Sequence, residues 1–67
     1  MNLLARITRR RPHIELVVRT TNPYWRLVAA NGRTIAHSET YSSLTKARAT
    51  AKSVAETFGI DVRDVPQ

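Results

Sequence analysis

Four arginines near the N-terminus form the strongest chemical feature of the sequence. Arg6, Arg9, Arg10 and Arg11 give residues 1–11 a charge of +4, whereas the rest of the chain carries a net charge of only +2. Clustered guanidinium groups neutralise phosphates, and basic arms also enter the minor groove of duplex DNA. We therefore expect residues 1–11 to form a basic N-terminal arm that contacts nucleic acid.

The same arm permits two other interpretations. Leu3, Leu4 and Ile7 have the spacing of one helical face, which suits a short amphipathic segment that binds a protein partner or a membrane surface. A solvated basic tail that contributes only to solubility is the third interpretation.

Basic residues outside the arm extend the candidate nucleic-acid surface. Tyr24 and Trp25 directly precede Arg26, and aromatic side chains beside arginines on a sheet can stack the bases of single-stranded nucleic acid. The alternative places Trp25 in the core and Tyr24 at an interface. The members of this surface outside the arm are Arg26, Arg33, Lys46 and Arg48.

The sequence shows no catalytic or metal-binding pattern. Its histidines are His13 and His37, it has no cysteine, and a metal site needs several ligands in a fixed geometry. His37 and Glu39 share a strand face, which makes a pair but not a site. The two glycines of the chain exclude a glycine-rich nucleotide loop. We expect surface histidines, no metal, no cofactor and no enzymatic activity.

Length and composition set the scale of the fold. The chain has 67 residues, 42% of them hydrophobic, which suits one small folded domain rather than a disordered tail. A domain this short buries only about 60% of its unfolded surface, so self-association is an available way to bury more. No apolar run matches a secretion signal or a membrane span, and we expect a soluble cytoplasmic protein.

Alternating apolar residues predict three strands. Residues 13–19 and 24–30 both have the two-residue period of a half-buried strand. Asn31 and Gly32 form a strong hairpin signal, because both residues tolerate a positive φ. Residues 33–38 then return as the third strand, which completes an antiparallel meander.

The type of hairpin turn decides the face on which Ile35 lies. A strict two-residue turn places Ile35 opposite Val28, away from Trp25, whereas a bulged turn with Gly32 in the left-handed region shifts the register by one residue. A single helix covers only one face of the sheet. We therefore favour the bulged turn, which puts Ile35 beside Trp25 and Leu27 in the core, and which also decides whether the hairpin arginines share a face.

Residues 44–58 have the pattern of an amphipathic helix. Ser42 or Ser43 is a suitable N-cap, and Gly59 is a typical helix stop. Residues 60–67 form a short C-terminal tail, whose apolar residues either pack as an added strand or stay loose. The apolar stripe of the helix consists of Leu44, Ala47, Ala51, Val54, Ala55 and Phe58.

The segment from Trp25 to Ser43 resembles the YegP-like family of small uncharacterised proteins. The shared pattern is an aromatic residue followed by Arg-Leu and alanines, then Asn-Gly, a return strand with isoleucine, Ser-Glu and Tyr-Ser-Ser. Members of that family often carry two tandem copies of a meander-plus-helix unit, and this chain has one, so the resemblance implies a homodimer. The resemblance implies a fold and no activity, and the basic arm is not part of the pattern.

The sequence therefore predicts an α+β fold over residues 12–59, a three-stranded antiparallel meander followed by one helix (βββα). The exposed sheet edges and a self-complementary apolar patch favour a two-fold homodimer. The expected function is that of a small non-enzymatic binding module that contacts nucleic acid through the basic arm and surface. The alternative is a protein–protein interaction module that acts through a sheet edge or the arm.

Overall fold

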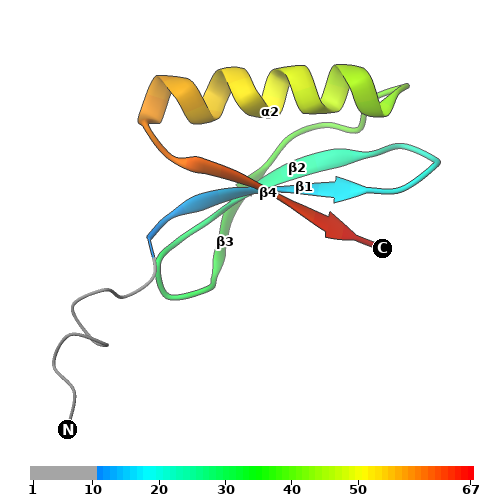
Figure 1. Cartoon of the computed structure of the whole chain (residues 1–67). Coiled ribbons are helices and arrows are strands. Elements are labelled where there is room, and N and C mark those ends of the chain that lie inside the picture. Colours follow the sequence, from blue (N-terminus) through cyan, green and yellow to red (C-terminus); the bar gives the residue numbers. More distant parts are fainter. Residues whose placement is uncertain (1–10) are drawn as a thin grey trace, which may run out of the picture.

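Four strands and one helix form two layers in the computed structural model, which describes residues 11–67 (Figure 1). Three of the predicted basic residues, Arg6, Arg9 and Arg10, lie outside the described residues. The strand order in the sheet is β3-β2-β1-β4, so that β1 and β2 occupy the interior. The elements are β1 His13–Val18, β2 Tyr24–Val28, β3 Thr34–His37, α2 Leu44–Phe58 and β4 Asp61–Pro66.

The first hairpin places its larger apolar residues on one face, as the two-residue period predicts. β1 and β2 are antiparallel, with Ile14 opposite Leu27 and Leu16 opposite Trp25. Ile14 and Leu16 are fully buried, and Trp25 and Leu27 pack against them while half-buried themselves. Because alternate residues point to opposite faces, these four side chains form the sheet side of the core.

The turn between β2 and β3 is bulged, with Gly32 at a φ of 89°. The N–H of Gly32 donates to the carbonyl of Ala29 at 2.9 Å, and the N–H of Ala29 donates to the carbonyl of Arg33 at 2.8 Å. This arrangement is a three-residue hairpin loop with glycine in the left-handed position. The predicted turn is confirmed.

The predicted core position of Ile35 is wrong, because the strand contains a second irregularity. Val28 lies opposite Thr34 and Leu27 lies opposite Ala36, so Ile35 is an extra residue in the ladder. Ala36 therefore takes the place beside Leu27, and Ile35 is 62% exposed. All four residues of β3 are exposed, since α2 packs on β1, β2 and β4 but not on β3.

Helix α2 has the predicted bounds and caps. Its N-cap is Ser43, whose side chain accepts a hydrogen bond from the N–H of Lys46 at 3.2 Å. Ala47, Ala51 and Ala55 are the buried residues of the helix, and they join Ile14 and Leu16 in one core cluster. Alanine side chains let the helix axis approach the sheet closely, so a small core is filled without large helical side chains.

The C-terminal end of α2 corrects one member of the predicted stripe. Gly59 has a φ of 66°, its N–H donates to the carbonyl of Glu56, and the N–H of Ile60 donates to the carbonyl of Ala55 at 2.9 Å. This pair of bonds is a Schellman motif, in which the residue after the glycine packs back on the helix. Ile60 accordingly packs against the core, whereas Phe58 is 68% exposed.

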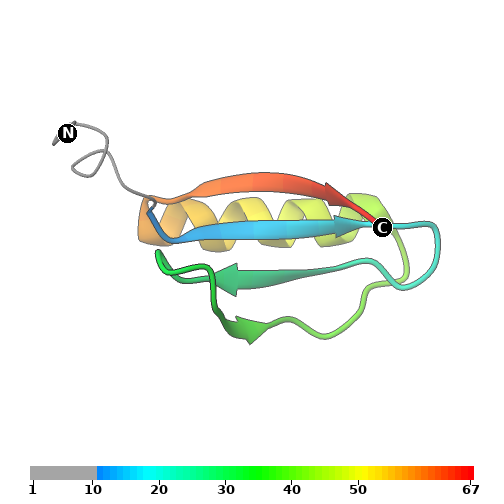
Figure 2. The same cartoon turned by 90° about the horizontal axis from the view of Figure 1, so that it is seen from below.

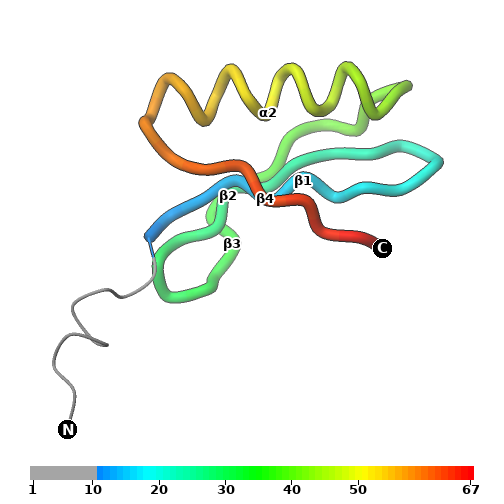
Figure 3. Tube along the Cα trace, in the orientation of Figure 1, coloured from blue at the N-terminus to red at the C-terminus, as the bar shows by residue number. Residues whose placement is uncertain are grey.

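The predicted antiparallel meander of β1, β2 and β3 is confirmed, but the sheet has a fourth strand and is therefore mixed rather than purely antiparallel. Residues that we expected to be a tail form β4, which pairs with β1 in parallel, with His13 opposite Asp61 and Val17 opposite Val65. Figure 3 follows the chain from β3 through α2 to β4, along the crossover that parallel pairing requires. Apart from these corrections, the α+β fold with one helix is as predicted.

Candidate functional site

The face of the sheet opposite α2 is the natural place for a binding surface, and we call it the open face. No helix among residues 11–67 lies on it, and Figure 2 views the sheet from this side, with α2 behind the strands. Val17 and Val28 belong to this face but are buried, so its accessible part is polar and aromatic. By register and alternation, its other members are His13, Glu15, Tyr24, Arg26, Thr34, His37, Asp61, Arg63 and Val65.

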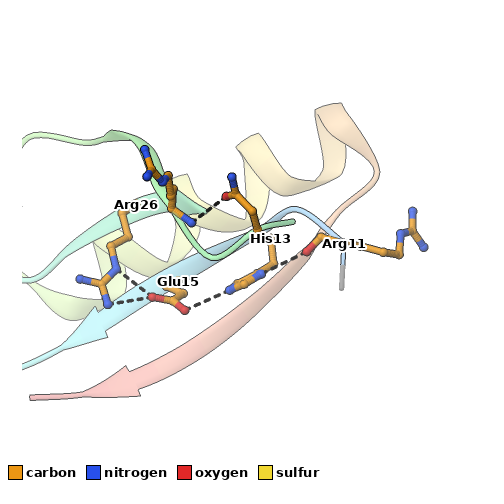
Figure 4. A network of polar contacts seen from close by, with 6 residues as sticks. Arg11, His13, Glu15 and Arg26 are labelled. Carbon is orange, nitrogen blue, oxygen red and sulfur yellow. Dashed lines mark hydrogen bonds and ion pairs between the residues drawn. The ribbon is translucent and has the colours of Figure 1, made fainter. Parts of the chain in front are cut away.

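A polar network crosses the middle of the open face (Figure 4). Arg26 donates a hydrogen bond from Nε to one carboxylate oxygen of Glu15 at 2.8 Å, and its Nη2 forms an ion pair with the same oxygen at 2.7 Å. The other oxygen of Glu15 lies 3.0 Å from Nε2 of His13. The hydrogen bonds with His13 and Arg26 lower the pKa of Glu15, although partial burial opposes them. The pKa of Arg26 is raised by its hydrogen bond to Glu15, so this pair is fully charged at neutral pH.

His13 is buried, with a residue exposure of 6%, so our expectation of a surface histidine is wrong for this residue. Its Nδ1 lies 3.3 Å from the main-chain carbonyl of Arg11, and its Nε2 faces the Glu15 carboxylate. Both partners are acceptors, so only the doubly protonated imidazole can donate to both at once. His13 thus ties the start of β1 to the network, while the side chain of Arg11 extends away from it (Figure 4).

A second cluster lies where β1 ends and the segment after β3 begins. The Cζ atom of Arg19 is 5.0 Å from the centroid of the Tyr24 ring, and the His37 ring meets Tyr24 edge-on at 6.3 Å. Arg19 donates from Nε to the carbonyl of Asn22 at 3.0 Å and from Nη1 to the side-chain oxygen of Gln67 at 2.9 Å. These contacts fix a guanidinium at the rim of a surface cavity of about 350 Å³.

The prediction that His37 and Glu39 share a strand face is wrong, because β3 ends at His37 and Glu39 lies beyond it. Nδ1 of His37 lies 3.2 Å from the carbonyl of Ser38, and the Ser38 hydroxyl donates to the carbonyl of Glu39 at 2.7 Å. The same hydroxyl accepts from the N–H of Trp25 at 3.0 Å. Residues 11–67 contain no group of three or more His, Cys, Asp or Glu side chains placed to hold a metal ion.

The structure separates the predicted basic residues onto two layers. Arg26 lies on the open face, whereas Arg33 is exposed in the turn that precedes β3. Lys46 is exposed and Arg48 half-exposed on α2, across the sheet from Arg26. Arg48 is neutralised by a bidentate pair with Asp64 at 2.9 and 3.0 Å, which raises the pKa of Arg48. The candidates that the structure describes, Arg11, Arg26, Arg33, Lys46 and Arg48, thus do not form one continuous surface.

The sequence placed Arg19 at the end of a strand but gave no signal of the cavity beside it. Arg63 was missed for a different reason, because it lies in the segment that we expected to be a tail. Arg63 is exposed on β4, opposite Glu15, and forms no ion pair with another residue of the range 11–67. A hydrophobic period of two marks strands, but nothing in the sequence marks their parallel pairing.

The fold is that of a small α+β domain with one helix and a four-stranded mixed sheet. Residues 20–59 match the family described as "Domain of unknown function (DUF1508)", and the chain belongs to this family, whose known group is the YegP-like proteins. The matched segment contains β2, β3 and α2. No curated protein and no solved structure matches the chain. None of the helices in the described range is both long and apolar enough to cross a membrane.

Proposed function

We propose that this protein is a small non-enzymatic binding module of the cytoplasm that contacts nucleic acid through its basic N-terminal arm and the open face. The observation that carries the proposal is a sheet with a helix on one side only, whose other side presents Tyr24 with Arg19, Arg26 and Arg63. Sheets of this kind bind single strands, because their flat surface supports splayed bases while arginines hold the phosphates.

The position of the arm supports the same assignment. Arg11 is exposed and lies two residues before β1, whose side chains form the centre of the open face. Residues 1–11 therefore join the sheet at the strand that carries His13 and Glu15. An arm and a sheet face that contact the same strand of nucleic acid would act together as a multivalent surface.

Fluorescence anisotropy tests this function. The full chain is titrated into labelled duplex DNA, single-stranded DNA and single-stranded RNA at about 50 and 200 mM salt, a range in which phosphate contacts weaken strongly. We expect micromolar binding that prefers the single strands, weakens at the higher salt, and is lost in the triple variant Arg9/Arg10/Arg11→Ala.

A matched variant controls for total charge. Lys46/Arg48/Lys52→Ala also removes three positive charges, but from α2 on the other layer, and we expect it to weaken binding less. Equal losses in both triple variants would reject the arm and the open face as the binding surface. Absence of binding at about 50 mM salt would reject the function itself.

A second candidate function is interaction with another copy of the chain through the edge of β4. Asp61 and Arg63 flank Val62 on this strand, so an antiparallel two-fold pair centred on Val62 sets each Asp61 opposite an Arg63 of the other copy. Cross-strand pairs of opposite charge stabilise a sheet. The neighbouring register would instead set Arg63 against itself, so charge selects the register centred on Val62.

Sedimentation velocity tests this homodimer. Asp61→Arg and Arg63→Asp each create repulsive pairs in the proposed register, and we expect both variants to be monomeric at concentrations where the parent is dimeric. The double swap Asp61→Arg/Arg63→Asp restores opposite charges and should restore the dimer. A monomeric parent, or single variants that dimerise as well as the parent does, would reject pairing through β4.

A further inference from the structure

Arg19 is held rigidly without being neutralised. Its partners are the carbonyl of Asn22, the amide oxygen of Gln67 and the ring of Tyr24, all of which are uncharged at neutral pH. Within residues 11–67 no carboxylate lies within ion-pair distance of it. Arg26 and Arg48, by contrast, are each paired with a carboxylate.

The geometry of Arg19 leaves donors free for a ligand. A guanidinium has five N–H groups, and the two hydrogen bonds to Asn22 and Gln67 use one on Nε and one on Nη1. The remaining N–H groups form the planar fork that binds phosphate in two-point fashion. Because the two hydrogen bonds and the contact with the face of Tyr24 hold the guanidinium, less rotamer entropy remains to be lost on binding.

The cavity beside Arg19 has the size and the walls of a small subsite. Its volume of about 350 Å³ falls at the lower end of the range for small-molecule sites. Its walls are Arg19, Tyr24, His37, Ser38, Glu39 and Thr40. Tyr24 links the two ends of the cavity, since Arg19 stacks on its ring while His37 meets it edge-on.

Glu39 adds a negatively charged group to a cavity that otherwise holds the positively charged Arg19. It is exposed, and its carboxylate forms no ion pair with another residue of the described range. A carboxylate only accepts hydrogen bonds, so it complements the exocyclic amino groups of cytosine, adenine and guanine. Thymine and uracil present a carbonyl in place of that amino group, and a carboxylate repels it.

We propose that this cavity holds one nucleotide of a bound single strand, with the phosphate on Arg19 and the amino group of the base on Glu39. The proposal rests on the nucleic-acid function proposed above and specifies one contact of it. It assigns a preference for cytosine over thymine or uracil to a single side chain.

The test measures binding of the full chain to short labelled oligomers of dC, dT, C and U over a series of salt concentrations. Arg19→Gln should weaken binding to dC about tenfold, because a charge-assisted contact is lost. It should also reduce the slope of log affinity against log salt by about 0.7, the value for one phosphate of a single strand. The ribose series shows whether the site accepts both sugars.

Lys52→Gln is the matched control, because it removes one positive charge from the exposed surface of α2. We expect its salt slope to equal that of the parent. Arg19→Lys keeps the charge at the cavity and should recover the slope, which separates loss of the contact from loss of folding. Circular dichroism checks that the variants retain the parent's secondary structure.

Glu39→Ala tests the base contact. It should bind dT and U more tightly than the parent does and should bind dC and dT equally. If Arg19→Gln and Lys52→Gln change the slope equally while the parent binds, the phosphate contact is overturned and the proposed function stands. A cytosine preference that survives in Glu39→Ala overturns the base contact, and a parent that binds no oligomer overturns both proposals.

Discussion

Glu15 and Arg26 lie directly opposite each other on β1 and β2, and one oxygen of Glu15 accepts a hydrogen bond from Nε of Arg26 at 2.8 Å and forms an ion pair with its Nη2 at 2.7 Å. The second oxygen of the same carboxylate is therefore free to face His13. One acidic group thus holds a guanidinium from the neighbouring strand and a buried imidazole from its own strand. This arrangement satisfies the polar groups in the middle of a sheet face that α2 does not cover.

The coupling between Glu15 and Arg26 is measurable. Their side chains are 22% and 32% exposed, so solvent screens the pair only in part. We expect a coupling energy of about 1 kcal/mol from the variants Glu15→Ala, Arg26→Ala and the double variant. Urea unfolding of the four proteins provides the free energies. Additive losses would mean that the two side chains do not stabilise each other.

Stability should depend on Glu15 at acid pH. Its folded-state pKa is lowered from 4.5 by the hydrogen bonds with His13 and Arg26, so the folded state favours the carboxylate. This contribution is fully present above about pH 4.5 and is lost as the pH falls through the lowered folded-state pKa. The pKa of Asp64 is also lowered, by its hydrogen bond with Arg48, so the parent must be compared with Glu15→Gln. The difference in unfolding free energy between the two should shrink on acidification, and a constant difference would contradict the assignment.

The alanine stripe of α2 should resist enlargement. Ala51 is fully buried in the core cluster, and Ala51→Leu should destabilise the fold by about 1–3 kcal/mol through overpacking. Ala49 lies two residues away on the same helix and is exposed. Ala49→Leu adds the same side chain without a steric clash, and its unfolding free energy should stay within about 0.5 kcal/mol of the parent's. Equal losses from both variants would contradict the close approach of helix and sheet.

Trp25 stabilises the fold through the packing of its ring and not through a hydrogen bond from its indole N–H. It packs against the core cluster, but its Nε1 is buried without a hydrogen-bond partner in the described part of the chain. Trp25→Phe keeps an aromatic ring and removes the unpaired donor, so we expect a loss below about 1.5 kcal/mol. Trp25→Ala should cost about 3 kcal/mol, the lower end for a large aromatic residue, because Trp25 is only half-buried. A Trp25→Ala variant as stable as the parent would remove this residue from the core.

The helix and the turn between β2 and β3 could be predicted because their signals are local. Ser43, Gly59 and the alanine spacing fix α2, and Gly32 fixes the bulged turn. The position of Ile35 depends on a further irregularity opposite Leu27 and Val28, which no residue type in β3 announces. A second bulge also interrupts the ladder of an edge strand and makes it a poorer template for pairing.

The sequence left residues 60–67 open between an added strand and a loose tail, because the signal for β4 is not local. Val62 and Val65 are three residues apart, so they match neither the period of a half-buried strand nor a helical stripe of useful length. What makes this segment a strand is its place beside β1, where the helical crossover delivers it. The burial of His13 has the same origin, since β1 lies in the interior of the sheet only because β4 pairs with it.

The candidate site, like the fold, has features that the sequence shows and features that only the folded chain brings together. The arginine-rich arm is visible in the sequence as a run of like charges, whereas the pairing of Arg26 with Glu15 depends on the β1–β2 register, which we did not predict from the sequence. The cavity beside Arg19 is not visible, because it combines side chains from the end of β1, the start of β2 and the segment after β3. The cavity, with Arg19 and Glu39 among its walls, forms only when these three segments come together in the fold.

The parallel pairing of β1 with β4 has a consequence for protein synthesis. Of the four strands, β1 leaves the ribosome first and β4 leaves it last, yet they are neighbours in the sheet. During translation β1 can form its hairpin with β2, but its other edge remains unpaired until residues up to Pro66 have emerged. Such long-range pairing slows folding, and it leaves the nascent chain with an exposed strand edge that chaperones recognise and that other nascent chains can contact.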